Sequence, residues 1–207
     1  MLSCSSIFWE VDVQADFMLP GGKLYVPGAE CLLPKIRKLT DAARRDDVFL
    51  VSHGCFHCED DPEFTQFPPH YMKGTPNTKL MPEALADRVA RVENRSTEKL
   101  PDDFSKYQQI LLEKQTLDIF KTMHADALLE RLGTSAEFVV FGVVTEFCVS
   151  CAVRGLLKRK RRVALVTDAI ETLAPEVGKR TIAELQSLGA RLTTTEEALA
   201  ALTDGHT

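Results

Sequence analysis

A cysteine stands where an apolar run meets the start of a predicted helix, and its thiol is the first candidate for chemistry. Residues 138–144 are apolar and rich in β-branched and aromatic side chains, the pattern of a strand buried on both faces of a sheet. Thr145 occupies the cap position, and apolar residues from Val149 onward recur with helical spacing, so Cys148 falls in the first helical turn. A helix start stabilises a thiolate and can also hold an oxyanion. The alternative left open is a buried, inert cysteine.

Two further ionisable side chains lie at or just beyond predicted strands. Asp12 lies near the end of residues 6–13, and Lys114 follows residues 109–112. A charged residue at a strand end is either a solvated terminus or part of a site. Taken alone, neither Asp12 nor Lys114 shows whether it is a solvated strand terminus or part of a site.

The elements that must position these residues alternate along the whole chain. The predicted strands are residues 6–13, 47–52, 109–112, 138–144, 163–167 and 191–193, and the predicted helices are residues 31–45, 117–132, a segment from about 148, 175–188 and 196–202. The alternation predicts an α/β fold, a three-layer αβα sandwich around a central, mostly parallel six-stranded sheet. Ligand sites in such sheets lie beyond the carboxyl ends of the strands, so we expect Asp12, Lys114 and Cys148 to converge.

The composition indicates one globular domain, residues 1–207, with 44% hydrophobic and 27% charged residues. A long loop, 53–82, and a charged excursion, 83–107, which we expect to be partly helical, interrupt the alternation. The net charge of −5 argues against a nucleic-acid partner, and the sequence predicts neither a membrane span nor a membrane partner. Six cysteines without a secretory signal indicate reduced thiols and a cytoplasmic protein.

Several motifs occur in an order that resembles the isochorismatase-like cysteine hydrolases, and most closely their nicotinamidase branch. The matching pieces are DVQADF, GKLYVPGAE, FPPHYMKGTP, EKQTLDIF and GVVTEFCV, which together span nearly all of the chain. The resemblance implies an isochorismatase-like, Rossmann-like fold. It also implies hydrolysis of a small amide such as nicotinamide through a cysteine thioester, with release of ammonia and a carboxylic acid, no organic cofactor, and a homo-oligomer.

The resemblance also implies roles for particular residues. Asp12, Lys114 and Cys148 would form a catalytic triad in which the carboxylate takes the thiol proton and the ammonium stabilises the resulting anions. The Val143–Val144 peptide bond would be cis, and the backbone N–H groups of Val144 and Cys148 would form the oxyanion hole.

Two aromatic residues match positions that surround the pyridine ring in nicotinamidases. These are Phe17 and Phe67, the latter at a position where a tryptophan is frequent. Filling the core is the alternative for both side chains.

The chain departs from nicotinamidases at the metal site, which in those enzymes uses one aspartate and three histidines. His57 and His70 match two of the histidines, Cys55 replaces the aspartate, and Glu63 or Asp61 falls near the remaining histidine. Cysteine, histidine and carboxylate all bind zinc, so Cys55, His57, Glu63 and His70 can form a zinc site. Loss of the metal is the alternative, as in branches that hydrolyse carbamoyl compounds.

Two other functions therefore stay open beside the nicotinamidase-like amidase. One is a metal-free hydrolase of carbamoyl or ureido substrates, which the altered metal ligands suggest. The other is a non-catalytic relative that binds a ligand on the same scaffold, which the intact aspartate, lysine and cysteine disfavour. The vinyl-ether chemistry of true isochorismatases is disfavoured because those enzymes do not keep a cysteine at the nucleophile position.

Overall fold

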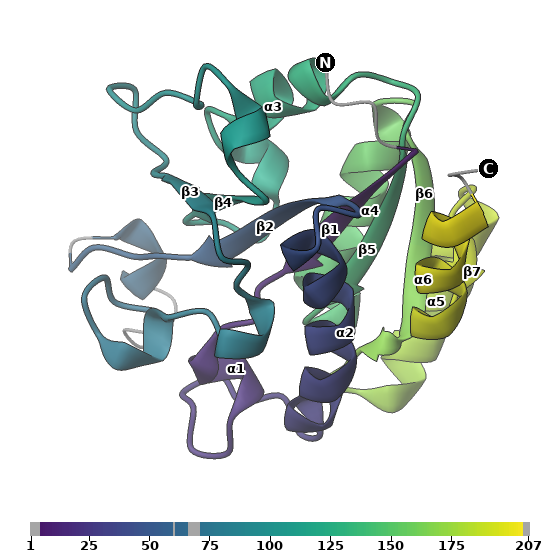
Figure 1. Cartoon of the computed structure of the whole chain (residues 1–207). Coiled ribbons are helices and arrows are strands. Elements are labelled where there is room, and N and C mark those ends of the chain that lie inside the picture. The colour runs from purple at the N-terminus through teal and green to yellow at the C-terminus, as the bar shows by residue number, and fades with distance from the viewer. Residues whose placement is uncertain (1–4, 60, 66–70, 205–207) are drawn as a thin grey trace.

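The computed structural model describes residues 5–59, 61–65 and 71–204 of the chain. Within these residues a seven-stranded parallel sheet forms the centre of the molecule, with the strand order β3-β4-β2-β1-β5-β6-β7 (Figure 1). The strands are β1 Ser6–Val11, β2 Phe49–Cys55, β3 Val89–Val92, β4 Gln109–Lys114, β5 Glu137–Gly142, β6 Arg162–Ile170 and β7 Arg191–Thr193. Because β1 lies between β2 and β5, the direction of strand order reverses at β1, and a ligand site is expected at the carboxyl ends of these strands.

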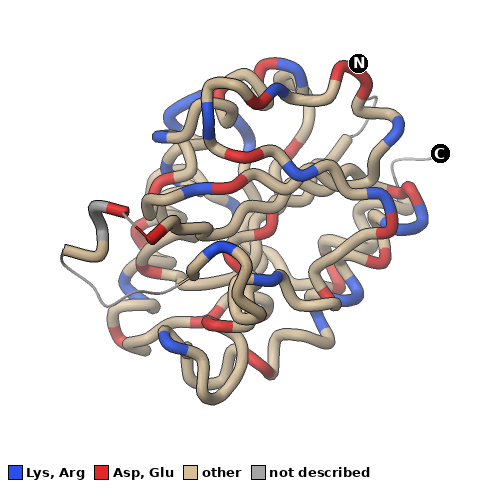
Figure 2. Tube along the Cα trace, turned by 90° about the vertical axis from the view of Figure 1, so that its left-hand side faces the viewer, with Lys and Arg blue, Asp and Glu red and all other residues tan. Residues whose placement is uncertain are grey.

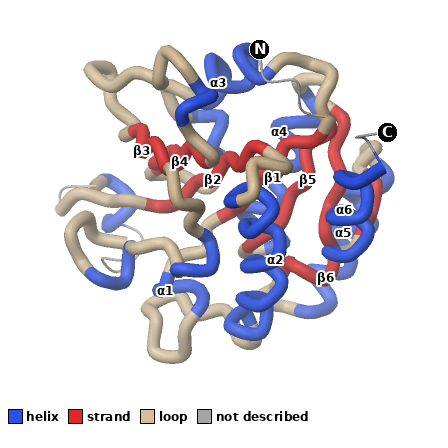
Figure 3. The backbone as a smooth tube through the Cα atoms, viewed as in Figure 1, coloured by secondary structure: helices blue, strands red, loops and turns tan. Residues whose placement is uncertain are grey.

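Helices cover both faces of the sheet and give three layers (Figure 3). The helices α2, Leu33–Arg44, and α6, Thr195–Asp204, contribute to the apolar core on one face. The helices α3, Ala125–Leu132, α4, Ser150–Lys158, and α5, Pro175–Ser187, contribute to the core on the other face. Alternate residues of β1 point into the two cores, with Phe8 on the side of α2 and Trp9 on the side of α4. A short helix, α1 Ala15–Met18, follows β1 directly.

The predicted α/β fold with a parallel sheet is confirmed, but the predicted number of six strands is wrong. The seventh strand is β3, which pairs with β4 at the edge of the sheet and lies in the segment 83–107 that we expected to be partly helical. That segment also holds the 3-10 helices Pro82–Ala84 and Phe104–Lys106. Val89 and Val92 fit helical spacing as well as strand pairing, and an edge strand tolerates the neighbouring charges that obscure its pattern.

Acidic and basic residues are interspersed along the trace in the view of Figure 2. With a net charge of −5, this distribution differs from the basic face expected of a nucleic-acid-binding protein. None of the helices in the described residues has the length and apolar character that a membrane crossing requires.

Candidate active site

The three residues predicted to converge do so at the carboxyl ends of three central strands, β4, β1 and β5. Asp12 follows β1, Lys114 ends β4, and Cys148 lies in a π-helix, Thr145–Val149, after β5. Lys114 Nζ lies 2.9 Å from Asp12 Oδ2 and 3.5 Å from Cys148 Sγ. All three side chains are buried, so the ion pair and the thiol share an environment with little water.

The backbone brings the ends of β1 and β5 together beside these residues. Asp12 has a positive φ of 52°, and Gly142, with a φ of 118°, packs directly against the backbone of Val11. Val143 N then donates to Val11 O at 2.9 Å. The Val143–Val144 peptide bond is cis, as predicted. The contact between the ends of β1 and β5 therefore places Asp12, which follows β1, close to the π-helix, which follows β5.

The cap predicted at Thr145 is not formed. Its hydroxyl and its backbone N–H both donate to Glu171 O, at 2.7 and 2.8 Å, so Thr145 joins the π-helix to the loop after β6. Val144, which precedes the π-helix, makes no side-chain cap. The helical segment that contains Cys148 therefore begins as a π-helix, and hydrogen bonds to the loop after β6 hold its first residue in place.

The electrostatics favour a protonated thiol beside an ionised carboxylate. Burial raises the pKa of Asp12, but the charge of Lys114 and the hydrogen bond from His53 outweigh it, and the pKa is lowered. Burial and the charge of Asp12 raise the pKa of Cys148 well above its usual range, despite the opposing charge of Lys114. Burial lowers the pKa of Lys114, but Asp12 and the two thiols Cys148 and Cys55 outweigh it, so the pKa is raised. The helix start was expected to favour a thiolate, and burial beside Asp12 outweighs that effect.

His53 is a site residue that the sequence did not single out. Its Nδ1 lies 3.3 Å from Asp12 Oδ1, and its side chain is fully buried inside β2. Burial lowers the pKa of His53, so a neutral ring that donates from Nδ1 fits the site. The strand was predicted to end at residue 52, which placed His53 in a loop and hid its position beside β1.

Cys55 lies next to the triad as the last residue of β2. Lys114 Nζ is 2.9 Å from Cys55 Sγ, so the ammonium group contacts two thiols. Gln14 fixes the backbone of Cys55, because its Oε1 accepts from Cys55 N at 2.7 Å and its Nε2 donates to Cys55 O at 2.8 Å. Cys55 thus has a defined, buried position, and it shares the ammonium group of Lys114 with Cys148.

Two residues of the predicted metal set lie close together in sequence at the end of β2, Cys55 as its last residue and His57 just after it. His57 Nδ1 lies 2.8 Å from Asp61 Oδ2, the kind of carboxylate contact that orients metal-ligating histidines. His70 and the side chain of Glu63 lie outside the described residues. Within the part of the chain that the structure describes, no group of three or more potential ligands gathers. Cys55 and His57 are of the donor types that zinc accepts, and they are the two predicted ligands whose side chains the structure describes.

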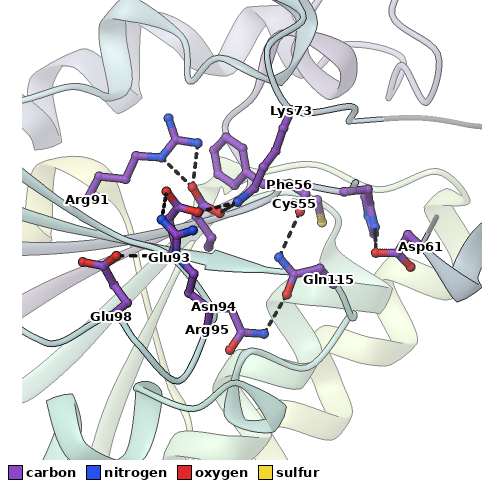
Figure 4. A network of polar contacts seen from close by, with 12 residues as sticks. Cys55, Phe56, Asp61, Lys73, Arg91, Glu93, Asn94, Arg95, Glu98 and Gln115 are labelled. Carbon is purple, nitrogen blue, oxygen red and sulfur yellow. Dashed lines mark hydrogen bonds and ion pairs between the residues drawn. The ribbon is translucent and has the colours of Figure 1, made fainter. Parts of the chain in front are cut away.

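A polar network anchors the segment after β2 to the edge of the sheet (Figure 4). Gln115 Nε2 donates to Phe56 O at 2.9 Å, and Asn94 Nδ2 donates to Gln115 Oε1 at 2.6 Å. The buried carboxylate of Glu113 lies 2.6 Å from both Lys73 Nζ and Arg91 Nη2. The two neighbours of Lys114 in the chain therefore both contact the segment after β2, Gln115 through Phe56 and Glu113 through Lys73.

A cavity of about 530 Å³ opens above the thiol. Cys148 and Val144 contribute to its lining, together with Phe17 and Tyr71, whose ring centroids are 4.7 Å apart. Phe17, predicted to contact substrate, therefore faces the cavity, whereas Phe67 lies outside the described residues. Tyr71 was missed because it follows the FPPH motif in a segment with no periodic pattern.

Comparison with known proteins agrees with this architecture. The family described as the isochorismatase domain matches residues 10–197. No match was found among curated proteins.

Solved structures share the fold at low sequence identity. An isochorismatase-like hydrolase from Alkaliphilus metalliredigens is 21% identical with a TM-score of 0.77, covering 96% of this chain and 99% of its own. The zinc complex of a pyrazinamidase from Pyrococcus horikoshii is 23% identical with a TM-score of 0.73, covering 92% and 99%. An N-carbamoylsarcosine amidase from Thermoplasma acidophilum is 22% identical with a TM-score of 0.70, covering 93% and 98%. With a family match over most of its length, the chain belongs to the isochorismatase family.

Proposed function

We propose that the protein is a hydrolase of a small, nicotinamide-like amide that acts through a thioester on Cys148. The observation that carries the proposal is the buried contact of Lys114 with both Asp12 and Cys148 at the base of a cavity. A carboxylate, a cation and a thiol in one water-poor site are the groups that nucleophilic cysteine catalysis requires.

The first half of the reaction transfers the acyl group to sulfur. Asp12 accepts the proton of the Cys148 thiol as the sulfur attacks the amide carbonyl carbon and forms a C–S bond. Lys114 stabilises the negative charge while it moves from the carboxylate to the sulfur. The raised pKa of Cys148, caused by burial and by Asp12, means that the thiolate forms during attack rather than in the resting enzyme.

Collapse of the tetrahedral intermediate completes this transfer and releases ammonia, and hydrolysis of the thioester then releases the acid. The tetrahedral oxyanion would be held by the backbone N–H groups of Val144 and Cys148. When it collapses, the C–N bond breaks and Asp12 returns its proton to the departing ammonia. Water then attacks the thioester while Asp12 takes a proton from it, the C–S bond breaks, and Asp12 reprotonates the sulfur.

We extend the proposal to a divalent metal ion, with zinc as the preferred ion. Cys55 and His57 would hold it, with Asp61 orienting the imidazole. Glu63 and His70 remain the proposed third and fourth ligands. When bound, the ion would take a ring nitrogen of the substrate, while Phe17 and Tyr71 would pack against the ring.

One observation favours a second candidate, a metal-free hydrolase of carbamoyl or ureido substrates. Cys55 Sγ is already in contact with Lys114 Nζ at 2.9 Å, so a metal would have to compete with the ammonium group for that sulfur. Elemental analysis of the purified protein separates the two candidates, because a stoichiometric metal ion contradicts the second one.

The direct test is ammonia release from nicotinamide and a panel of small amides. Cys148→Ala should abolish turnover, whereas Cys151→Ala, which removes a half-buried thiol three positions along the chain, should leave it within a factor of two or so. Full activity of the Cys148→Ala variant would refute the proposal. Ligand binding without turnover of any amide would support the non-catalytic alternative.

A further inference from the structure

Exposed apolar side chains gather at the mouth of the active-site cavity. Leu24, Leu117, Phe147 and Leu173 line the cavity, and their residues are 38% to 49% exposed. They are four of the eight large apolar residues that are exposed in the described part of the chain, and we refer to them as the apolar rim. The first precedes β2, and the others follow β4, β5 and β6, so four separate segments each direct one apolar residue to the same opening.

The path from the thiol to this rim is also apolar. The rings of Phe17 and Tyr71 line the same cavity as Cys148, and like the thiol they are buried, whereas the apolar rim is exposed. Among the described residues that line the cavity, Lys23 carries the only charged side chain. The other polar side chains of this lining are those of Tyr25, Tyr71 and Thr116, so a polar substituent that extended from the reacting carbonyl would lose water and find few partners to replace it.

The size of the cavity also exceeds what a single-ring amide needs. Pockets that enclose drug-sized ligands measure about 300–1,000 Å³, and this cavity of about 530 Å³ lies within that range. A substrate with one ring would occupy the space near Cys148 and leave the apolar rim in contact with water. Burial of the rim therefore requires a longer substrate.

We propose that the substrate is a primary amide whose acyl group carries an apolar tail, either arylalkyl or medium-chain alkyl, that reaches the apolar rim. This proposal rests on the amidase function and the thioester chemistry proposed above, and it replaces the single-ring amide by a longer one. The tail belongs to the acyl group, so it stays in place after ammonia leaves and holds the thioester in the cavity while water attacks. The apolar rim thus serves both halves of the reaction.

The test is the dependence of kcat/KM on tail length, measured by ammonia release from butanamide, hexanamide and 4-phenylbutanamide, with nicotinamide for comparison. Each additional buried methylene should raise kcat/KM about fourfold. The double variant Leu117→Ser, Leu173→Ser should flatten this dependence. The matched control Leu188→Ser, which changes an exposed leucine outside the cavity, should keep the wild-type dependence.

Binding to the Cys148→Ala variant separates this proposal from the proposed catalysis. Calorimetry should show tighter binding of 4-phenylbutanamide than of nicotinamide, and this preference tests the tail even if no amide is turned over. Amide turnover with no dependence on tail length, or equal binding of the two amides, would overturn the proposal. It would also be overturned if sedimentation showed that the rim double variant dissociates an assembly, because the rim would then be a contact between copies of the chain.

Discussion

Lys114 places one ammonium group among a carboxylate and two thiols. It contacts Asp12, Cys55 and Cys148 and is itself fully buried. The pKa of Asp12 is lowered and that of Cys148 is raised, so the resting negative charge belongs to the carboxylate. The proposed reaction depends on moving that charge, so residues that hold Asp12 in its ionised form should control the pH range of activity.

His53 is the residue best placed to exert such control. Its hydrogen bond lowers the pKa of Asp12, so His53→Ala should raise that pKa. Because Asp12 must be ionised to accept the thiol proton, activity falls as pH drops through its pKa. The acid limb of kcat/KM should therefore move to higher pH in the variant, with kcat/KM reduced about 10-fold to 100-fold.

The pH profile distinguishes positioning of Asp12 from a purely structural role of His53. His53→Gln, which keeps a donor, should recover part of the loss, and His124→Gln, at a partly exposed histidine outside the site, should behave as wild type. An unchanged acid limb in His53→Ala would contradict the assigned role.

Glu10 is a buried acid that lies outside the proposed chemistry. Burial, opposed by the hydroxyl of Ser52, raises its pKa well above 4.5. Below that ordinary pKa both the folded and unfolded states are protonated. As pH rises, the unfolded state loses the proton first, so the free energy of unfolding should fall by about 1.4 kcal/mol per pH unit until the folded pKa is reached.

Glu10→Gln should remove this loss and be more stable than wild type at neutral pH, with the difference growing between pH 5 and 7. Urea unfolding at several pH values measures it, with the exposed Glu130→Gln as control. A constant difference between wild type and Glu10→Gln across this range would show that Glu10 does not keep its proton.

At the scale of elements, the junction between β1 and β5 determines how Asp12 and Cys148 meet. Gly142 lies opposite Val11 in the sheet register, and a Cβ at Gly142 would collide with the Val11 carbonyl oxygen. The neighbouring atoms are backbone and cannot rotate away. The positive φ of Gly142 adds a second reason why another residue is disfavoured.

Gly142→Ala should therefore reduce stability by about 2 kcal/mol or more and reduce kcat/KM more than this loss explains, since the strands separate beside the triad. Gly133→Ala is the matched control, because Gly133 also has a positive φ but a Cβ there meets open space. It should lose about 1 kcal/mol of stability and keep its activity in the folded fraction. Equal effects of the two substitutions on kcat/KM would contradict this account of the junction.

The same elements show how far the sequence predicts the site. The contact of Asp12, Lys114 and Cys148 was predictable because each follows or ends an apolar run, and parallel strands bring such ends together. His53 was not, because its strand continues through polar residues as far as Cys55. The strand β3 was missed since its few apolar residues also fit helical spacing, and only pairing with β4 decides between the two.

At the scale of the whole molecule, the edge of the sheet is coupled to the proposed active site through Glu113. This residue precedes Lys114 in β4, and its buried carboxylate binds Arg91 of β3 and Lys73 of the segment after the FPPH motif. Three parts of the chain that are distant in sequence thus meet at one side chain. If the Glu113 carboxylate is lost, the side chains of Lys73 and Arg91 are still partly exposed to water, so the free energy of unfolding should fall only moderately.

Glu113→Gln should lower the free energy of unfolding by about 1–3 kcal/mol. The substitution should also lower kcat/KM, because Lys73 and β3 lose the carboxylate that holds them against β4, the strand that carries Lys114. Denaturant unfolding and ammonia release measure the two effects. Glu98→Gln, which removes a more exposed partner of Arg95 in the same network, should change stability by less than about 0.5 kcal/mol. If both variants keep wild-type kcat/KM, the edge network stabilises the fold without positioning the triad, and the coupling argued from Glu113 is wrong.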